Sequence, residues 1–372
     1  MKKIMWQPSV EQIQGSQMFE FKEFINDRHG LNLENYHDLH DWSVNRIPEF
    51  WDSAWSFFNI LHSQPYTQVV DDVSKMPGAI WFDGTRLNFA ENLLRRRDDK
   101  TAIVFKGEGQ PVRKLTYNEL YSAVVKTAHA LKELGVNKGD RIAGFVPNMP
   151  ESIIAMLATT AIGAIWSSSS PDFGIKGVLD RFSQIEPKVL FAANGYFYNG
   201  KAHDSLEKLQ GILQDLPSVE KVVVIPYSEK DPNINSINNS ILFSDFIEND
   251  AEEIEFEQLP FDHPLYIMYS SGTTGLPKSI VHGAGGTLLQ HLKELRLHCD
   301  ISEQDNVFYF TTCGWMMWNW LASGLATKAS IVLYDGAPMA PAADCLLKMA
   351  DELDLHVFGT SASYLAALEK SG

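Results

Sequence analysis

The stretch from Tyr269 to Lys278, YSSGTTGLPK, carries residue types that can hold a polyphosphate. Gly272 and Gly275 would let the backbone approach a ligand closely, and successive N–H groups in such a turn form an anion-binding nest. Lys278 adds a point charge. The hydroxyl donors are Ser270, Ser271, Thr273 and Thr274. We therefore predict that this stretch binds phosphate groups.

The spacing of this stretch differs from that of the mononucleotide P-loop. The P-loop is GxxxxGK[ST] and runs into a helix, whereas Leu276 and Pro277 here separate Gly275 from Lys278. The residues after Lys278 favour a strand, and the apolar run PLYIM precedes the stretch. We predict a strand–loop–strand unit that receives no help from a helix dipole. A flexible linker has a different composition and is disfavoured.

The elements that would position this loop follow an α/β pattern. From Thr101 onward, strands alternate with helices, which predicts parallel βαβ units with helices on both sheet faces. One helix begins at Thr116, where Glu119 completes a capping box, and further helices are predicted over 202–216 and 287–299. The run WSSSSPDFG, with Ser167–Ser170, is expected to be a polar loop that either lines a ligand crevice or caps a helix.

The first hundred residues have a different character. Residues 36–61 are dense in Trp, Phe and His, and their apolar positions recur at helical spacing, as at Trp51 and Trp55. This pattern predicts an amphipathic helical cap on a larger body. A length of 372 residues suits two or three domains. We assign 1–98 to a helical module and 99–372 to the α/β domain.

Composition limits the class of partner. The net charge of −16 disfavours nucleic acid and anionic membranes as partners. Three cysteines without paired or zinc-like spacing fit a reducing compartment, and we predict no metal-ligating residues. The N-terminus lacks the apolar region of a signal peptide, and the longest apolar run, 153–166, is short for a bilayer. We expect a cytoplasmic protein.

The string YSSGTTGLPKSIVH closely resembles the phosphate-binding signature of the ATP-dependent, AMP-forming acyl-adenylate enzymes, which include acyl-CoA synthetases, luciferases and peptide-synthetase adenylation domains. The resemblance implies the fold of the N-terminal domain of these enzymes, and ATP, Mg²⁺ and coenzyme A as substrates and cofactors. It implies catalytic roles for Thr273 and Lys278. It also implies that the β- and γ-phosphates of ATP are held by Ser270, Ser271, Gly272, Thr273, Thr274, Gly275 and Lys278.

Two further segments narrow the branch of the family. The aromatic block at 36–55 resembles the N-terminal module of short-chain acyl-CoA synthetases. FYFTTCGWMMWNWLASG, at 308–324, lies where acetate enzymes carry a Trp-led segment lining the carboxylate pocket, which implies that Trp315, Met316 and Met317 form the acyl pocket. The Met pair provides flexible walls and favours a small acid other than acetate. Taken by itself, this aromatic string is more typical of a protein core.

A third segment, ANGYFYNGK at 193–201, lies where the family binds the nucleotide end of coenzyme A. The resemblance implies that Tyr198, Asn199 and Lys201 bind coenzyme A, although the acetate enzymes are rich in arginine there. Together the three segments resemble the acetoacetate-activating branch, so the expected small-molecule partners are acetoacetate, ATP and coenzyme A. A ligase for acetate, propionate or another short acid, and a non-catalytic remnant that only binds nucleotide, remain the alternatives.

The family's adenine-binding segment and its mobile C-terminal domain with a catalytic lysine have no counterpart that we find after Gly324. We therefore expect an AMP-binding domain that is incomplete at its C-terminus and whose missing partner is the C-terminal portion of the enzyme. The isolated chain is expected to be inactive. Steady AMP formation from ATP, Mg²⁺, acetoacetate and coenzyme A would contradict this expectation.

Overall fold

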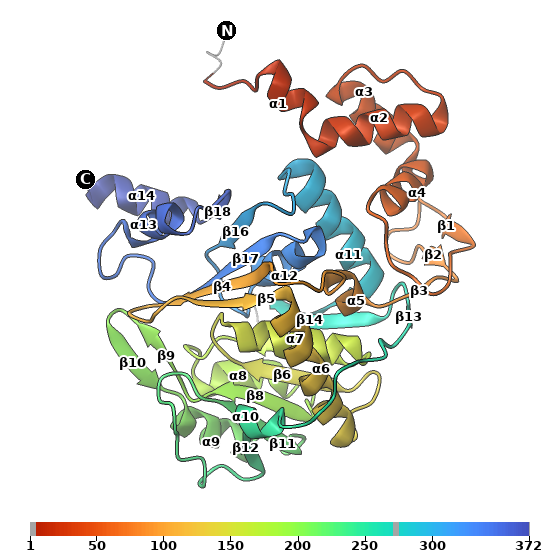
Figure 1. Cartoon of the computed structure of the whole chain (residues 1–372). Coiled ribbons are helices and arrows are strands. Elements are labelled where there is room, and N and C mark those ends of the chain that lie inside the picture. The colour runs from red at the N-terminus through yellow and green to blue at the C-terminus, as the bar shows by residue number, and fades with distance from the viewer. Residues whose placement is uncertain (1–4, 271–274, 372) are drawn as a thin grey trace.

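The structure is a computed structural model that describes residues 5–270 and 275–371. Figure 1 shows a body built on two sheets, with the N-terminal helices α1 to α4 at its periphery. No helix within these ranges is long and apolar enough to cross a membrane.

The N-terminal segment is mostly helical and is held together by aromatic side chains. The Trp55 and Phe82 rings stack with centroids 4.8 Å apart, and Phe21 meets Phe57 edge-on at 5.0 Å. The predicted cap over 36–61 is two helices, and the second begins at Ile47 with Pro48 in its first turn, where proline is favoured. Three short strands were not predicted. The elements are α1 (Val10–Gln14), α2 (Gln17–His29), α3 (Tyr36–Asn45), α4 (Ile47–Phe57), β1 (Gln68–Val70), β2 (Trp81–Asp83), β3 (Arg86–Leu87) and α5 (Phe89–Leu93).

The larger sheet has seven strands in the order β12-β11-β8-β6-β7-β14-β15. All neighbouring pairs are parallel except β14 and β15, which form an antiparallel hairpin at one edge. β7, which contains three of the serines expected in a loop, lies between β6 and β14. The strands are β6 (Arg141–Phe145), β7 (Ile165–Ser169), β8 (Val189–Ala193), β11 (Lys221–Ile225), β12 (Ser240–Leu242), β14 (Pro264–Ser270) and β15 (Lys278–Gly283).

The smaller sheet has five strands in the order β18-β16-β17-β4-β5 and is parallel except for its β4–β5 pair. Two separate two-stranded sheets, β1–β2 and β9–β10, and the short β13–β3 pair complete the strands. The strands are β4 (Thr101–Gly107), β5 (Arg113–Thr116), β9 (Gly195–Tyr198), β10 (Lys201–Asp204), β13 (Leu259–Pro260), β16 (Asn306–Tyr309), β17 (Ser330–Asp335) and β18 (Val357–Gly359).

Two helices pack against each other between the sheets. α6 (Tyr117–Glu133) contacts β4 and β5, whereas α7 (Pro150–Ala161) contacts β6 and β7 (Figure 1). All of α7 except Glu151 is buried. The predicted capping box of Thr116 and Glu119 is present at the start of α6. The remaining helices are α8 (Ile175–Phe182), α9 (Leu206–Gln214), α10 (Phe243–Phe246), α11 (Ala284–Leu292), α12 (Met316–Ser323), α13 (Cys345–Glu352) and α14 (Ala362–Ser371).

The mixed α/β architecture is confirmed, but two predicted helices have different starts. The helix expected from residue 202 begins at Leu206, because Lys201–Asp204 pairs with β9 as a strand. The helix expected from residue 287 begins at Ala284 and continues as a π-helix over Lys293–His298.

Candidate nucleotide and acyl site

The described ends of the phosphate-loop stretch belong to the β14–β15 hairpin. Ser270 pairs with Lys278 at the last step of the ladder, so the strand–loop–strand prediction is confirmed. Gly275 has φ 142°, a conformation that side chains rarely adopt. Lys278 is exposed. Residues Ser271, Gly272, Thr273 and Thr274, which carry most of the predicted phosphate contacts, lie outside the described residues.

The carboxyl end of β7 joins this hairpin to the predicted acyl segment. The Ser167 hydroxyl donates to the Ile267 carbonyl on β14 at 2.9 Å, and the Ser168 hydroxyl donates to the Cys313 carbonyl at 2.7 Å. The Ser169 hydroxyl oxygen is buried and has no hydrogen-bond partner among the described residues. These serines are in a strand, not in the predicted loop. They hold together two segments that are far apart in sequence, and Ser169 adds an unused donor beside them.

The predicted acyl-pocket residues differ in how much of each side chain is exposed to solvent. Trp315, at the N-cap of α12, is 66% exposed and Met316 is 46% exposed, whereas Met317 is partly buried against the core. Trp318 is fully buried, and its indole N–H donates to the Asn148 side-chain oxygen at 3.0 Å. The interpretation of this string as ordinary core therefore applies to Trp318 but not to Trp315. Contiguous exposed apolar patches mark interaction surfaces, so the adjacent exposed side chains of Trp315 and Met316 are candidates for ligand contact.

The predicted coenzyme A residues lie together on the β9–β10 hairpin. Tyr198 pairs with Lys201, and the turn between them has Asn199 and Gly200 at φ 55° and 76°. Tyr198 is 49% exposed. A cavity of about 560 Å³ adjoins the turn and is lined by Asn199 and Lys201 but not by Tyr198. The Asn-Gly pair is a strong hairpin signal, and it could have predicted this turn from the sequence.

Two acidic side chains that were not predicted to have a role meet this hairpin. Glu108, just after β4, accepts hydrogen bonds from the backbone N–H groups of Asn199 and Gly200. Asp335, at the end of β17, accepts from the Phe197 N–H at 3.2 Å. Burial raises the pKa of Asp335 to about 6, and the Phe197 N–H opposes this effect. Both carboxylates come from the smaller sheet, so they join the hairpin to it.

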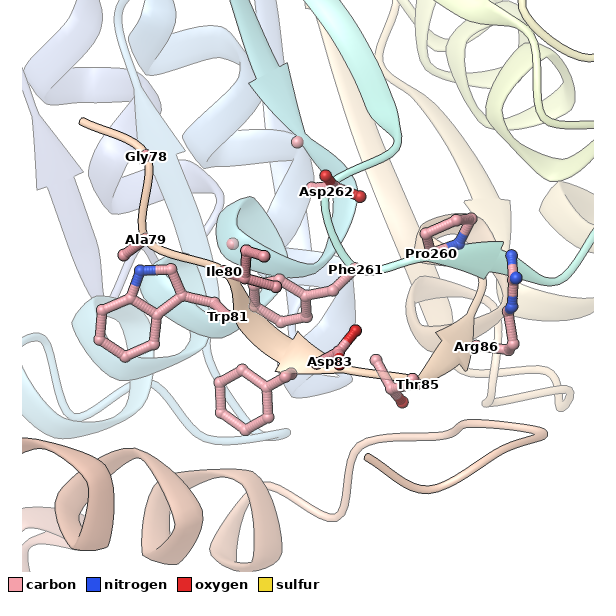
Figure 2. Close-up of a pocket in the computed structure, with 14 residues that line it drawn as sticks. Gly78, Ala79, Ile80, Trp81, Asp83, Thr85, Arg86, Pro260, Phe261 and Asp262 are labelled. Atoms are coloured by element: carbon pink, nitrogen blue, oxygen red, sulfur yellow. The ribbon is translucent and has the colours of Figure 1, made fainter. Parts of the chain in front are cut away.

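A second large cavity lies away from all of these residues. It has a volume of about 570 Å³ between the N-terminal segment and the β13–β14 connection. Figure 2 shows Gly78 to Arg86 on one side and Pro260 to Asp262 on the other. None of the predicted site residues lines it. Among the described ranges, no cluster of three His, Cys, Asp or Glu side chains could hold a metal ion.

Comparison with known proteins defines the class. The model of the AMP-binding enzyme family matches residues 89–372, and the model of the acetyl-coenzyme A synthetase N-terminus matches residues 36–93. The chain therefore belongs to the AMP-binding enzyme family. The domain boundary between residues 98 and 99 stays a prediction.

Individual proteins are similar to this chain along nearly its whole length. The chain is 49% identical to the acetoacetyl-CoA synthetase of Danio rerio, over 99% of this chain and 56% of the relative. It is 41% identical to a malonamoyl-CoA synthetase of Penicillium aethiopicum, over 99% of this chain and 54% of the relative. The solved acetoacetyl-CoA synthetase of Streptomyces lividans superposes with a TM-score of 0.95 at 42% identity, covering all of this chain and 57% of that one. The chain thus spans a little over half the length of these relatives.

Proposed function

We propose that the chain forms the ATP- and acid-binding part of an AMP-forming acid–thiol ligase that converts acetoacetate to acetoacetyl-CoA. The similarity to acetoacetyl-CoA synthetases along the whole chain supports the choice of acid. One structural observation supports the site. Ser167 of β7 bonds to β14, the strand that leads into the phosphate loop, and Ser168 bonds to Cys313 in the segment that leads to Trp315. Both segments therefore meet at the carboxyl end of β7. Ligands of open α/β sheets bind at the carboxyl ends of the strands.

In this proposal the acid's carboxylate attacks the α-phosphorus of ATP, forming acyl-AMP and releasing pyrophosphate. Lys278 and the hydroxyl-rich loop hold the β- and γ-phosphates and stabilise the charge that develops on the leaving group. The coenzyme A thiol then attacks the acyl carbon and displaces AMP. Mg²⁺ neutralises phosphate charge and is usually bound largely through substrate phosphate oxygens, so we propose no protein ligand for it.

Trp315 and Met316 are proposed to contact the acid. Their exposure leaves the indole and thioether surfaces free, and a flexible Met side chain adapts to the extra carbonyl and methyl of acetoacetate. We propose that the Ser169 hydroxyl donates to an oxygen of the bound acid or of the α-phosphate. A buried hydroxyl without a partner is costly, and a ligand oxygen would satisfy it.

The test is a chimera in which this chain precedes the remaining part of the Danio rerio relative, because the chain spans 56% of that protein. We expect AMP release that requires acetoacetate, ATP and coenzyme A together. A panel of acetate, propionate, malonamate and acetoacetate identifies the acid, and the Danio rerio protein is the positive control. AMP release with every acid except acetoacetate would refute the proposal in favour of another short-chain ligase.

A further inference from the structure

Glu108 is a buried carboxylate whose only hydrogen-bond partners among the described residues are backbone N–H groups. It is 8% exposed, and within the described ranges it has no ion pair. Its oxygens accept from the N–H groups of Asn199 and Gly200 and, at 2.7 Å, from that of Ala337. Burying a charge is costly unless hydrogen bonds compensate it. These three bonds therefore account for the presence of a carboxylate here.

The three donors belong to two different parts of the fold. Asn199 and Gly200 form the turn of β9–β10, which lies in the chain between β8 and β11 of the larger sheet, whereas Ala337 follows β17 of the smaller sheet. The Glu108 N–H also donates to the Asp335 carbonyl at 2.7 Å, which fixes the backbone on which the carboxylate stands. Glu108 therefore joins the hairpin turn to the end of the smaller sheet.

Gly336, which follows Asp335 in the chain, leaves little free space around the Glu108 side chain. Gly336 has φ 152°, and a Cβ at that position would lie 2.6 Å from the Glu108 Cβ and 3.0 Å from one of its carboxylate oxygens. The β9–β10 pair belongs to neither large sheet, and an isolated two-stranded hairpin is only marginally stable. The conformation of its turn thus depends on contacts of this kind.

We propose that Glu108 is a positioning residue for coenzyme A binding. By holding the Asn199–Gly200 turn, it fixes Asn199 and Lys201 at the mouth of the 560 Å³ cavity so that they meet the nucleotide end of coenzyme A. This inference rests on the proposed function, because it takes coenzyme A as the ligand of the hairpin. Glu108 also lines this cavity, and we assign it no direct contact with the ligand, because its carboxylate oxygens already accept from the three backbone N–H groups. Its negative charge is covered by N–H groups, whereas the cation offered to a phosphate is that of Lys201.

The test compares coenzyme A and ATP binding by isothermal titration calorimetry on the 372-residue chain. Glu108→Gln keeps the size of the side chain but replaces one accepting oxygen with a donor that faces N–H groups. We expect the Kd for coenzyme A to rise at least about tenfold, as expected for the loss of a charge-assisted hydrogen bond. The Kd for ATP should change less than about twofold. Asp52→Asn, in the N-terminal helices, is the matched carboxylate-to-amide control and should change neither value.

Two further measurements separate positioning from general stability. Hydrogen exchange should speed up at the amides of Asn199, Gly200 and Ala337, with the rest of the chain unchanged. Gly336→Ala brings a Cβ against the Glu108 side chain and should weaken coenzyme A binding in the same way. Glu108→Asp should restore part of the affinity lost in Glu108→Gln. These variants test the inference even if Glu108→Gln does not fold.

The possible outcomes are distinct. Unchanged coenzyme A affinity in Glu108→Gln and Gly336→Ala would overturn the inference and leave the proposed function intact. Equal losses for ATP and coenzyme A would also overturn it, because they would show a purely structural role. A wild-type chain that binds neither ligand would overturn the proposed function together with the inference.

Discussion

Replacing Asp335 with Asn should change how the stability of the protein depends on pH. Burial raises the pKa of Asp335 from 3.8 to about 6, and the negative charges of Glu108 and Asp172 act in the same direction. Between these two pKa values the unfolded chain has released the proton that the folded protein still holds. The unfolded state then binds fewer protons, so the free energy of unfolding falls as the pH rises.

The magnitude follows from the size of the shift. One pKa unit corresponds to about 1.36 kcal/mol, so the shift to about 6 removes roughly 3 kcal/mol of stability between pH 3.5 and pH 7.5. Roughly 2 kcal/mol of this loss falls above pH 4.5. The amide introduced by Asp335→Asn cannot ionise, yet its oxygen can still accept the Phe197 N–H. Relative to wild type, the variant should therefore gain stability as the pH rises.

The assay is urea unfolding of wild type and Asp335→Asn from pH 4.5 to pH 7.5. Asp262→Asn, an exposed aspartate, provides the control for the change in net charge. The difference in unfolding free energy between Asp335→Asn and wild type should grow by roughly 2 kcal/mol across this range, whereas the control difference should stay flat. Parallel curves for wild type and Asp335→Asn would refute the reasoning, because they would mean that the carboxyl group ionises alike in both states.

Three further predictions concern the site and its supports. Trp318→Ala should lower the free energy of unfolding in urea by about 3–5 kcal/mol, because Trp318 is fully buried. Trp315→Ala should lower it by less than about 0.5 kcal/mol. Equal losses would place Trp315 in the core. Lys278→Ala should raise the Kd for ATP by about 10- to 100-fold in calorimetry, because a charge-assisted contact is lost. Coenzyme A binding should stay unchanged. An unaltered ATP affinity would exclude Lys278 from the phosphate site. Gly195→Ala should destabilise the protein by about 1–3 kcal/mol in the same unfolding assay. The reason is that a Cβ there would lie 2.4 Å from the His203 carbonyl oxygen of the paired strand. Unchanged stability would mean that the hairpin backbone shifts freely.

The features that the sequence predicted correctly depend on local chemistry. The capping box of Thr116 and Glu119 and the strand–loop–strand around Pro277 follow from the preferences of adjacent residues, and both are present in the structure. Helix α7, which is buried between the sheets, contains most of the longest apolar run of the sequence, residues 153–166. Such signals do not require knowledge of which elements lie side by side.

The features that the sequence did not predict depend on contacts between distant segments. Glu108 stands between two glycines in a turn that looks exposed, and its burial arises only when β9–β10 and β17 meet it. The serines of β7 were expected in a loop because their hydroxyls are polar, but their bonds to β14 and Cys313 allow them to be buried in a strand. Within WMMW, composition alone could not tell the exposed Trp315 from the buried Trp318.

The proposed function assigns the selection of acetoacetate to the Trp315 segment of this chain. The most direct test is the ratio of kcat/KM for acetoacetate to that for acetate in the chimera, measured with and without Trp315→Ala. Each additional group filling an apolar pocket contributes about 10- to 200-fold to discrimination, so we predict a ratio above about 100 that falls at least tenfold in the variant. A ratio near or below one, or a ratio that Trp315→Ala leaves unchanged, would contradict the claim.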